Sequence, residues 1–343
     1  MTEPLLDIRG LKTHFATDDG IVHAVDGVDL AIGRGETVGV VGESGCGKTI
    51  TAMSVLKLIP MPPGRIVAGQ ILWKGRDLVP LDADAMRRIR SKEIAIVFQE
   101  PMTSLNPVYT IGDQIAEVIR LHEGLSRRGA LDKTVEMLRL VNIPNPERRV
   151  RDYPHQFSGG MRQRVMIAMA LINDPDLLIA DEPTTALDVT TQAQILSLMK
   201  TLQEDFGSAI IMITHDLGVV AEIADDVLVM YAANVVEQAT VYDLFSQPQH
   251  PYTWGLMGSL PRLEADVERL TQIPGQPPSL LRPPSGCRFH PRCPYVMEVC
   301  KTTVPALAPT SRDPDHLQKC HLDEETKERE AAKLLAATMA EAG

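Results

Sequence analysis

Short apolar runs separated by glycine, proline and acidic residues recur along the chain and predict alternating strands and helices. A β-branched run at 38–41 indicates a strand, and apolar residues at helical spacing follow from Ala52 to Leu58. The run at 93–101 also indicates a strand. The runs at 175–183 and 208–216 are rich in isoleucine and leucine, which is typical of strands buried on both faces. The pattern therefore predicts an α/β core.

Helical patterns fill the chain between these strands. Residues from about 107 to 155 are predicted to be mostly helical, with breaks at 124–129 and 142–147, where glycine or proline recurs. A further helix is predicted from Ser158, with glycines at its start and Asp174-Pro175 beyond its end.

The character of the chain changes after residue 258. Residues 261–287 are rich in proline and weakly periodic, which predicts a linker leading into a small irregular unit. Residues 326–343 are rich in Ala, Glu and Lys and predict a polar helical or disordered tail. We therefore expect a main domain at 1–258, an extension at 259–325 and this tail.

Composition and charge exclude several classes of protein. The chain of 343 residues has a formal net charge of −11, which argues against nucleic-acid binding through a basic surface. The N-terminal segment lacks the apolar core of a secretory signal, and no apolar run approaches the about 18 residues that cross a bilayer. Five cysteines are too few for a secreted disulfide scaffold and favour a reducing compartment.

A phosphate-binding loop is the strongest chemical signal. The pattern G-x-x-x-x-G-K-[ST] is matched by Gly42, Glu43, Ser44, Gly45, Cys46, Gly47, Lys48 and Thr49. Glycines let backbone N–H groups approach phosphate oxygens, and the following helix N-terminus favours negative charge. We expect Lys48 to reach the β- and γ-phosphates of a nucleotide and the Thr49 hydroxyl to bind Mg²⁺.

Polar residues at the ends of three predicted strands complete this site. Asp181 and Glu182 follow a buried strand, where Asp181 is placed to hold Mg²⁺ and Glu182 to polarise an attacking water. His215 ends another strand at the same predicted edge. Gln99 ends a third, where its amide can ligate Mg²⁺ or orient water.

A longer set of motifs in this order resembles the ATP-binding subunit of an ABC transporter, over about residues 5–255. It comprises the phosphate-binding loop, Gln99, YPHQFSGGMRQRV (153–165), Asp181-Glu182, TALD (185–188) and His215. The segments FQEPMTSLNP, YPHQFSGG and HPYTWGLM, with the late cysteines, resemble the dipeptide/oligopeptide (peptide/nickel) importer branch. The resemblance implies an ABC-type P-loop core with an antiparallel β subdomain, a helical subdomain at about 100–156, and a small Cys-containing C-terminal extension.

The resemblance also implies residue roles. In this family two ATPase subunits meet head to tail around ATP, so the signature loop acts in trans; here it is Ser158, Gly159, Gly160 and Met161. Asp188 belongs to the loop that crosses the dimer interface. Glu182 is the general base, His215 the γ-phosphate sensor and Gln99 the link to the helical segment. Phe15 is the candidate for stacking on adenine, with a core or edge position as its alternative.

Two departures from the family pattern are visible. The signature reads FSGGM where the generic form is LSGGQ, and it keeps bulk and apolarity around an intact Ser-Gly-Gly core. MYAANVVE has Ala233 and Asn234 where a glycine turn is usual. Because asparagine tolerates a left-handed turn, we expect Asn234 to preserve the hairpin.

The partners follow from the resemblance as well. They are a second ATPase subunit (a copy or a diverged homologue), two multi-span membrane permease subunits docked on the helical segment, and an external peptide-binding protein. The expected location is the cytoplasmic face of a bacterial plasma (inner) membrane. Dipeptides, longer peptides and nickel chelates all remain open as substrates. The alternatives are a soluble ABC ATPase acting on nucleic acid or translation machinery, and an iron-sensing regulatory module.

Four late cysteines form a separate candidate site. Cys287, Cys293, Cys300 and Cys320 lack the paired C-x-x-C spacing of zinc sites and the common ferredoxin spacings. Free thiols, disulfides and zinc therefore all stay open, and His290, His316 or His321 could replace a ligand. The resemblance implies a ligand set for a four-iron, four-sulfur cluster. Cys46 is expected to be a small packing residue, and its alkylation is expected to block ATP binding.

Overall fold

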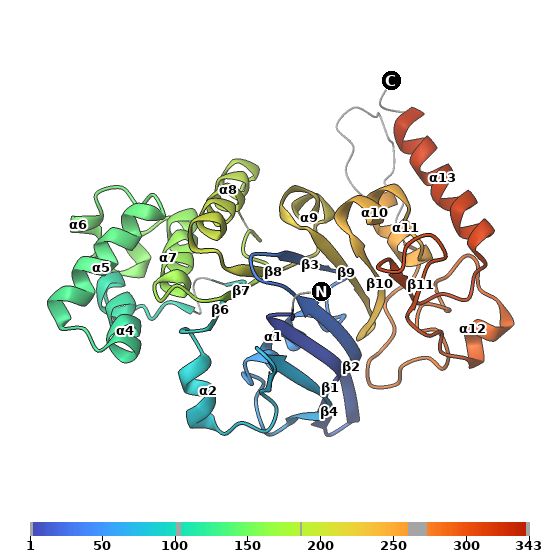
Figure 1. The fold of residues 1–343 in the computed structure, drawn as a ribbon, viewed down its shortest axis with the longest axis horizontal. Helices are drawn as coiled ribbons and strands as arrows, with labels where there is room; N and C mark the ends of the chain where they lie inside the picture. Colours follow the sequence, from blue (N-terminus) through green and yellow to red (C-terminus); the bar gives the residue numbers. More distant parts are fainter. Residues whose placement is uncertain (1–2, 101–103, 186, 260–272, 341–343) are drawn as a thin grey trace.

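The computed structural model describes residues 3–100, 104–185, 187–259 and 273–340. It arranges them as two sheets with a helical lobe at one end and a C-terminal extension at the other (Figure 1). Parts of the predicted helical segment (101–103), the TALD motif (186), the linker (260–272) and the tail (341–343) lie outside the described residues.

A four-stranded antiparallel sheet occupies the N-terminal part, in the order β2-β1-β4-β5. Its strands are β1 (Leu6–Thr17), β2 (Gly20–Ile32), β4 (Gly64–Trp73) and β5 (Arg76–Asp77). Leu6, Ile8 and Leu11 of β1 are fully buried because they face the core, while neighbouring positions reach the surface. This sheet is the antiparallel β subdomain that the resemblance implied.

An eight-stranded sheet in the order β11-β12-β10-β9-β3-β8-β7-β6 forms the centre. Its strands are β3 (Thr37–Val41), β6 (Ile94–Val97), β7 (Leu177–Asp181), β8 (Ala209–Thr214), β9 (Asp226–Tyr231), β10 (Asn234–Thr240), β11 (Ala308–Pro309) and β12 (Leu317–Gln318). The run β9-β3-β8-β7-β6 is parallel. The strands predicted near 38–41, 93–101, 175–183 and 208–216 are confirmed. Because parallel strands end at a common edge, their last residues gather there.

Apolar side chains bury both faces of the parallel strands, as predicted. Leu178 and Ala180 face the helical lobe, whereas Leu177 and Ile179 face the antiparallel sheet. A third hydrophobic cluster, around Tyr252, packs against the extension. Among the described residues, no helix has the length and apolarity needed to cross a membrane.

The helices flank these sheets. They are α1 (Lys48–Val55), α2 (Ala83–Ile89), α4 (Ile111–Glu123), α5 (Arg127–Leu140), α6 (Pro146–Arg149), the 3-10 turn η1 (Pro154–Gln156), α7 (Gly159–Leu171), α8 (Val189–Phe206), α9 (Leu217–Ile223), α10 (Val241–Ser246), α11 (Pro251–Gly258), α12 (Glu298–Thr302) and α13 (Glu324–Ala340). The helical lobe, α4 to α7, lies on the left of Figure 1. Its predicted breaks are confirmed: Gly124 ends α4 with φ 67°, and Ser126 caps α5.

The extension joins the central sheet instead of forming an independent unit. Its strand β12 pairs with β10, and α13 packs against α11. Lys327 and Ala331 of α13 are buried, so this part of the predicted tail is a docked helix.

The turn between β9 and β10 differs from the prediction. Ala232 and Ala233 take positive φ values of 44° and 68°, while Asn234 already belongs to β10. The expected hairpin is present, because β9 and β10 pair antiparallel, but the expectation that Asn234 supplies its left-handed residue is wrong. The turn is fixed from outside, because Ala233 N donates to Cys46 O at 2.9 Å and Asp26 N donates to Ala233 O at 2.9 Å.

Candidate functional site

The phosphate-binding loop connects β3 to α1 at the carboxyl edge of the sheet (Figure 1). The Lys48 ammonium donates hydrogen bonds to Gly42 O at 2.6 Å and Glu43 O at 3.1 Å. Glycine is required at Gly42 and Gly47, which have φ values of 153° and 106°. A Cβ there would lie 2.2 Å from Met230 O and 2.4 Å from Ala24 O, respectively.

A cleft of about 470 Å³ opens over this loop. It is lined by Ala24, Ser44, Gly45, Gly47, Lys48, Thr49, Ile50, Gln99, Glu182, Thr185, His215 and Leu280. The cleft therefore brings the loop together with Gln99, Glu182 and His215, three of the four polar residues predicted at other strand ends; the fourth, Asp181, is buried and contacts Thr49. Sequence reasoning missed Ala24 and Leu280, because no local motif marks either residue.

Glu182 is the point where the predicted catalytic residues meet. Its Oε2 accepts a hydrogen bond from Gln99 Nε2 at 3.0 Å and from Thr185 Oγ1 at 2.9 Å. His215 Nδ1 lies 3.3 Å from the same oxygen. Glu182 has φ 47°, a left-handed conformation that is uncommon for glutamate and clusters at functional sites. Its role as the base that accepts a proton from the attacking water stays a prediction.

Thr49 and Asp181 form the predicted magnesium pair. Thr49 Oγ1 donates a hydrogen bond to Asp181 Oδ1 at 3.1 Å. Burial is the main factor that raises the pKa of Asp181, which is 3% exposed. A hydroxyl and a carboxylate are oxygen ligands that suit Mg²⁺, so these residues fit the ion. The Gln99 amide nitrogen contacts Glu182 instead, and its role as an Mg²⁺ ligand stays a prediction.

The signature residues lie outside the cleft of their own chain. Ser158 Oγ caps α7 by accepting a hydrogen bond from Met161 N at 3.3 Å, with Gly159 and Gly160 in the first turn. Asp188 similarly caps α8 and accepts from Thr191 N at 2.9 Å. None of these residues lines the cleft over the phosphate-binding loop. Their action on a second chain's nucleotide stays a prediction.

Phe15 also lies outside the lining of the cleft. It is half-buried in β1, opposite Val22 of β2, and packs against Gly64 at the start of β4. Adenine stacking on Phe15 stays a prediction.

Cys46 is a buried packing residue of the loop. Its side chain is 5% exposed, and burial raises the pKa of the thiol. Because alkylation requires an accessible thiolate, the predicted modification of Cys46 is disfavoured in the folded protein.

The four late cysteines are not arranged as a compact ligand set. All five cysteines are free, so the disulfide alternative is not realised. Four thiolates around zinc lie about 3.8 Å apart, given Zn–S bonds of about 2.3 Å. Within the described residues, no three of these sulfur atoms lie within 4.8 Å of one another. Burial, the largest cause, raises the pKa of Cys293 to about 12 and that of Cys320 to about 11.

The histidines proposed as substitute ligands have other partners. His316 Nε2 lies 2.8 Å from the buried Glu237 carboxylate, His290 Nδ1 lies 2.9 Å from Cys287 O, and His321 Nε2 lies 2.9 Å from Thr303 O.

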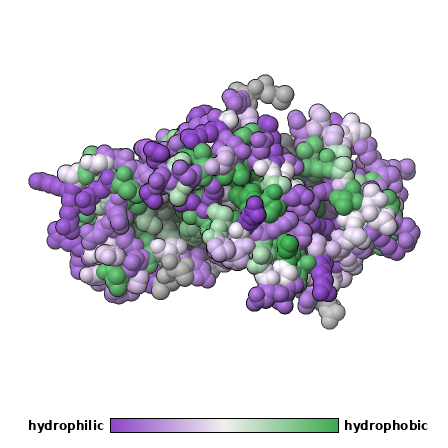
Figure 2. Space-filling model, turned by 90° about the horizontal axis from the view of Figure 1, so that it is seen from below, coloured by the Kyte–Doolittle hydropathy of each residue, from purple (hydrophilic) through white to green (hydrophobic). Residues whose placement is uncertain are grey.

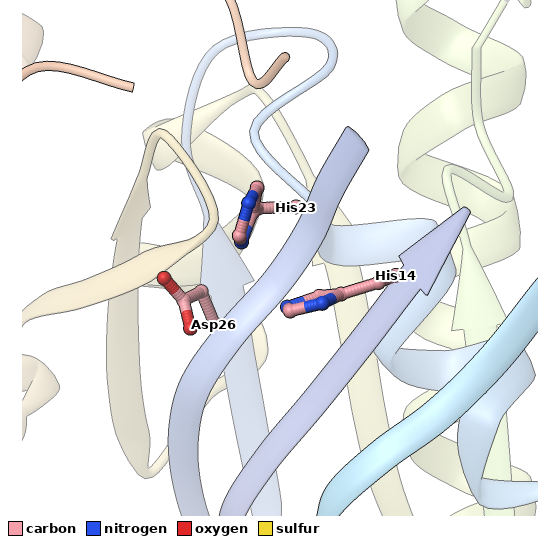
Figure 3. Close-up of side chains that lie close together, drawn as sticks. All are labelled: His14, His23 and Asp26. Atoms are coloured by element: carbon pink, nitrogen blue, oxygen red, sulfur yellow. The ribbon is translucent and has the colours of Figure 1, made fainter. Parts of the chain in front are cut away.

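A group of metal-ligand type does occur at His14, His23 and Asp26, whose ligand atoms lie within 4.8 Å of one another (Figure 3). Two cations already neutralise the Asp26 carboxylate. Lys12 Nζ lies 2.9 Å from Oδ1, and Arg288 pairs with Oδ2. A divalent ion would be repelled by both cations, so this arrangement disfavours a metal site.

Comparisons with known proteins agree with this geometry. Residues 25–185 match the family described as ABC transporter, and residues 236–300 match the oligopeptide/dipeptide transporter, C-terminal region. A probable peptide ABC transporter ATP-binding protein of Sinorhizobium fredii is 53% identical, over 92% of this chain and 94% of that protein. The oligopeptide transport ATP-binding protein OppD of Bacillus subtilis is 55% identical, over 86% of this chain and 83% of that protein.

The solved structures support the same assignment. The dimeric structure of MJ0796, a bacterial ABC transporter cassette, matches with a TM-score of 0.62 and 27% identity, over 69% of this chain and 98% of that chain.

The match to the oligopeptide/dipeptide transporter C-terminal region covers part of the extension, including Cys287, Cys293 and Cys300. The chain therefore belongs to the family of peptide ABC transporter ATP-binding proteins.

Proposed function

We propose that this chain is the ATP-hydrolysing subunit of an importer of dipeptides, oligopeptides or related solutes such as nickel chelates. The observation that carries the proposal is the pairing, in one chain, of a hydrolytic cleft around Glu182 with an extension of the oligopeptide/dipeptide transporter type. The two alternatives, an ATPase of nucleic-acid or translation machinery and an iron-sensing module, explain only one of these two features.

The proposed cycle uses two cassettes. ATP binds to the phosphate-binding loop of one, and the Ser158 turn of the other closes over its γ-phosphate. Support comes from the exposed position of the α7 N-terminus, whose N–H groups suit an anion, and from the dimeric state of the related MJ0796 cassette. Mg²⁺, held by Thr49 and Asp181, would supply charge neutralisation at the phosphates. Glu182 accepts the proton of the attacking water, and loss of the γ-phosphate releases the Ser158 turn.

An apolar groove supplies the proposed docking site for the membrane permease subunits. A cavity of about 530 Å³ lies between the helical lobe and the core. Its lining includes Leu58, Phe98, Val118, Met166 and Met169. The face in Figure 2 shows hydrophobic side chains around a hollow on the side of the helical lobe. Phe98 directly precedes Gln99 in the chain. A structural change at Glu182 would therefore be transmitted to a permease segment bound in this groove.

The remaining partners and the location belong to the same proposal. A complete importer would contain two permease subunits, a second cassette that is either a copy or a diverged homologue, and an external peptide-binding protein. The cassette would sit on the cytoplasmic face of the bacterial plasma membrane. The names of its relatives support the peptide substrate class.

The comparisons give no support to the predicted four-iron, four-sulfur cluster, and the proposed function does not depend on it. Protein purified without oxygen provides its test. About four iron atoms per chain with broad visible absorbance would establish a cluster, and colourless, iron-free protein would remove it.

The proposed function is tested with the assembled transporter in vesicles. ATP turnover and uptake of a labelled peptide library are measured with and without the external binding protein. We expect peptide-stimulated turnover and ATP-dependent uptake, both lost in Glu182→Gln. Full ATP turnover without uptake of peptides or nickel chelates would contradict the proposed substrate class.

A further inference from the structure

We propose that Arg292, in the C-terminal extension, is a positioning residue of the nucleotide site: it holds the Glu43 carboxylate away from the phosphates and cancels its charge. The proposal rests on ATP binding by the phosphate-binding loop and is independent of what the transporter carries.

The contact between Arg292 and Glu43 is a two-pronged ion pair. Arg292 Nη1 donates to Glu43 Oε2 at 2.6 Å, and Nη2 donates to Oε1 at 2.9 Å. The Arg292 side chain is only 4% exposed, and the Glu43 side chain is 26% exposed. Parallel donation from a buried guanidinium fixes both the position and the direction of a carboxylate.

The extension holds this guanidinium rigidly. Arg292 Nε donates to Pro274 O at 2.9 Å, and Nη2 also donates to Ile273 O at 3.2 Å. The guanidinium carbon lies 5.8 Å from the centre of the Tyr231 ring. These contacts fix the position of the Arg292 guanidinium, to which the Glu43 carboxylate binds.

Glu43 is tied to the site on its other sides. Its N–H donates to the Tyr252 hydroxyl at 2.8 Å, and its carbonyl accepts from Lys48 Nζ at 3.1 Å. Tyr252 is fully buried and packs against Phe289, which belongs to the same short segment as Arg292. Glu43 is thus held through its backbone by Tyr252 of the main domain and through its carboxylate by Arg292 of the extension.

The charge of Glu43 explains why these contacts of Glu43 matter for nucleotide binding. Its neighbour Ser44 lines the cleft, so the carboxylate belongs to a loop that must receive a polyphosphate anion. Without Arg292, that carboxylate would repel the anion and compete for the Lys48 ammonium. Glu43 interacts with the extension in place of the nucleotide, although it is part of the nucleotide-binding motif.

A charge-pair series in the full-length chain tests the proposal. Arg292→Gln should raise the ATP KM about tenfold and leave kcat at saturating ATP within about threefold of wild type. Glu43→Gln should lower the ATP KM, because Arg292 then adds positive charge beside the phosphates. Arg292→Gln combined with Glu43→Gln should recover most of the loss caused by Arg292→Gln.

Arg288→Gln is the matched control. Arg288 belongs to the same segment and forms a largely buried ion pair with the main domain, but its partners are Asp26 on β2 and the carbonyl of Ala232, and it does not bind Glu43. We expect it to lower the melting temperature while leaving the ATP KM within about twofold of wild type.

Three results would overturn the proposal: an unchanged ATP KM in Arg292→Gln, no recovery in the double variant, or an equal rise in Arg288→Gln. If Arg292→Gln does not fold, Glu43→Gln decides alone. A lower KM supports charge cancellation, and an unchanged or higher KM contradicts it. Peptide transport enters none of these measurements, so failure of the proposed function is a separate result.

Discussion

The Gln99 amide donates a hydrogen bond to the Glu182 carboxylate, with 3.0 Å between Nε2 and Oε2. This contact joins the strand that leads into the helical lobe to the base expected to activate water. A shift of the segment after β6, which carries Gln99, would change this contact. The hydrogen bond therefore connects the proposed base to the residue that follows Phe98, which lines the groove proposed for the permease.

Glu182→Gln should reduce ATP turnover by at least about a hundredfold and preserve ATP binding. A neutral amide keeps the shape and the contacts of the carboxylate but accepts no proton from water. Turnover is measured by phosphate release, and binding by titration of ATP in the same preparation. Turnover close to that of wild type would remove Glu182 as the base.

Asp226 should make the stability of the fold depend on pH. Burial, followed by its hydrogen bond with Glu36 and the nearby charges of Glu36, Asp225 and Asp315, raises the pKa of Asp226 to about 7. An unfolded aspartate titrates near pH 4, so between about pH 4 and 7 the folded state binds more protons than the unfolded state. The free energy of unfolding contributed by this group therefore falls as pH rises through that window.

Asp226→Asn tests this dependence because it mimics the protonated side chain. The gain in the denaturant midpoint over wild type should be small at pH 4.5, grow up to about pH 7 and then stay constant. A difference that does not change with pH would contradict the assignment.

Ala233→Gly should stabilise the protein by about 0.5–1 kcal/mol, because alanine at φ 68° carries a steric cost that glycine avoids. The control is Ala31→Gly, at an exposed position of β2, which should destabilise the protein by a similar amount. Both are measured by chemical denaturation. Destabilisation by Ala233→Gly would contradict this expectation and show that the buried methyl group of Ala233 stabilises the fold by more than the left-handed backbone costs.

Local motifs predicted the core of the site because the residues within each motif determine its backbone structure. The glycines at Gly42 and Gly47 determine the loop, and the strand before Asp181 places the carboxylates at the sheet edge. Parallel pairing then brings Gln99, Glu182 and His215 together, so their convergence was predictable from strand ends alone.

Contacts between distant parts of the chain could not be predicted in this way. Arg292 and Glu43 are 249 residues apart, and a single arginine in a proline-rich segment carries no signal of its partner. Leu280 reaches the cleft for a similar reason: its carbonyl accepts from His23 N at 3.0 Å. The Ala232-Ala233 turn was missed because its left-handed backbone is imposed by Cys46, Asp26 and Arg288, without a turn-forming residue.

The central claim is that ATP bound to one cassette is hydrolysed only when the Ser158 turn of a second cassette closes over it. The most direct test is Ser158→Arg, measured for ATP binding in the isolated chain and for ATP turnover in the assembled transporter. Since Ser158 lies outside the cleft of its own chain, the account predicts unchanged ATP binding and loss of at least about half of the turnover. Turnover equal to wild type in the assembled transporter, or loss of ATP binding in the isolated chain, would contradict the account.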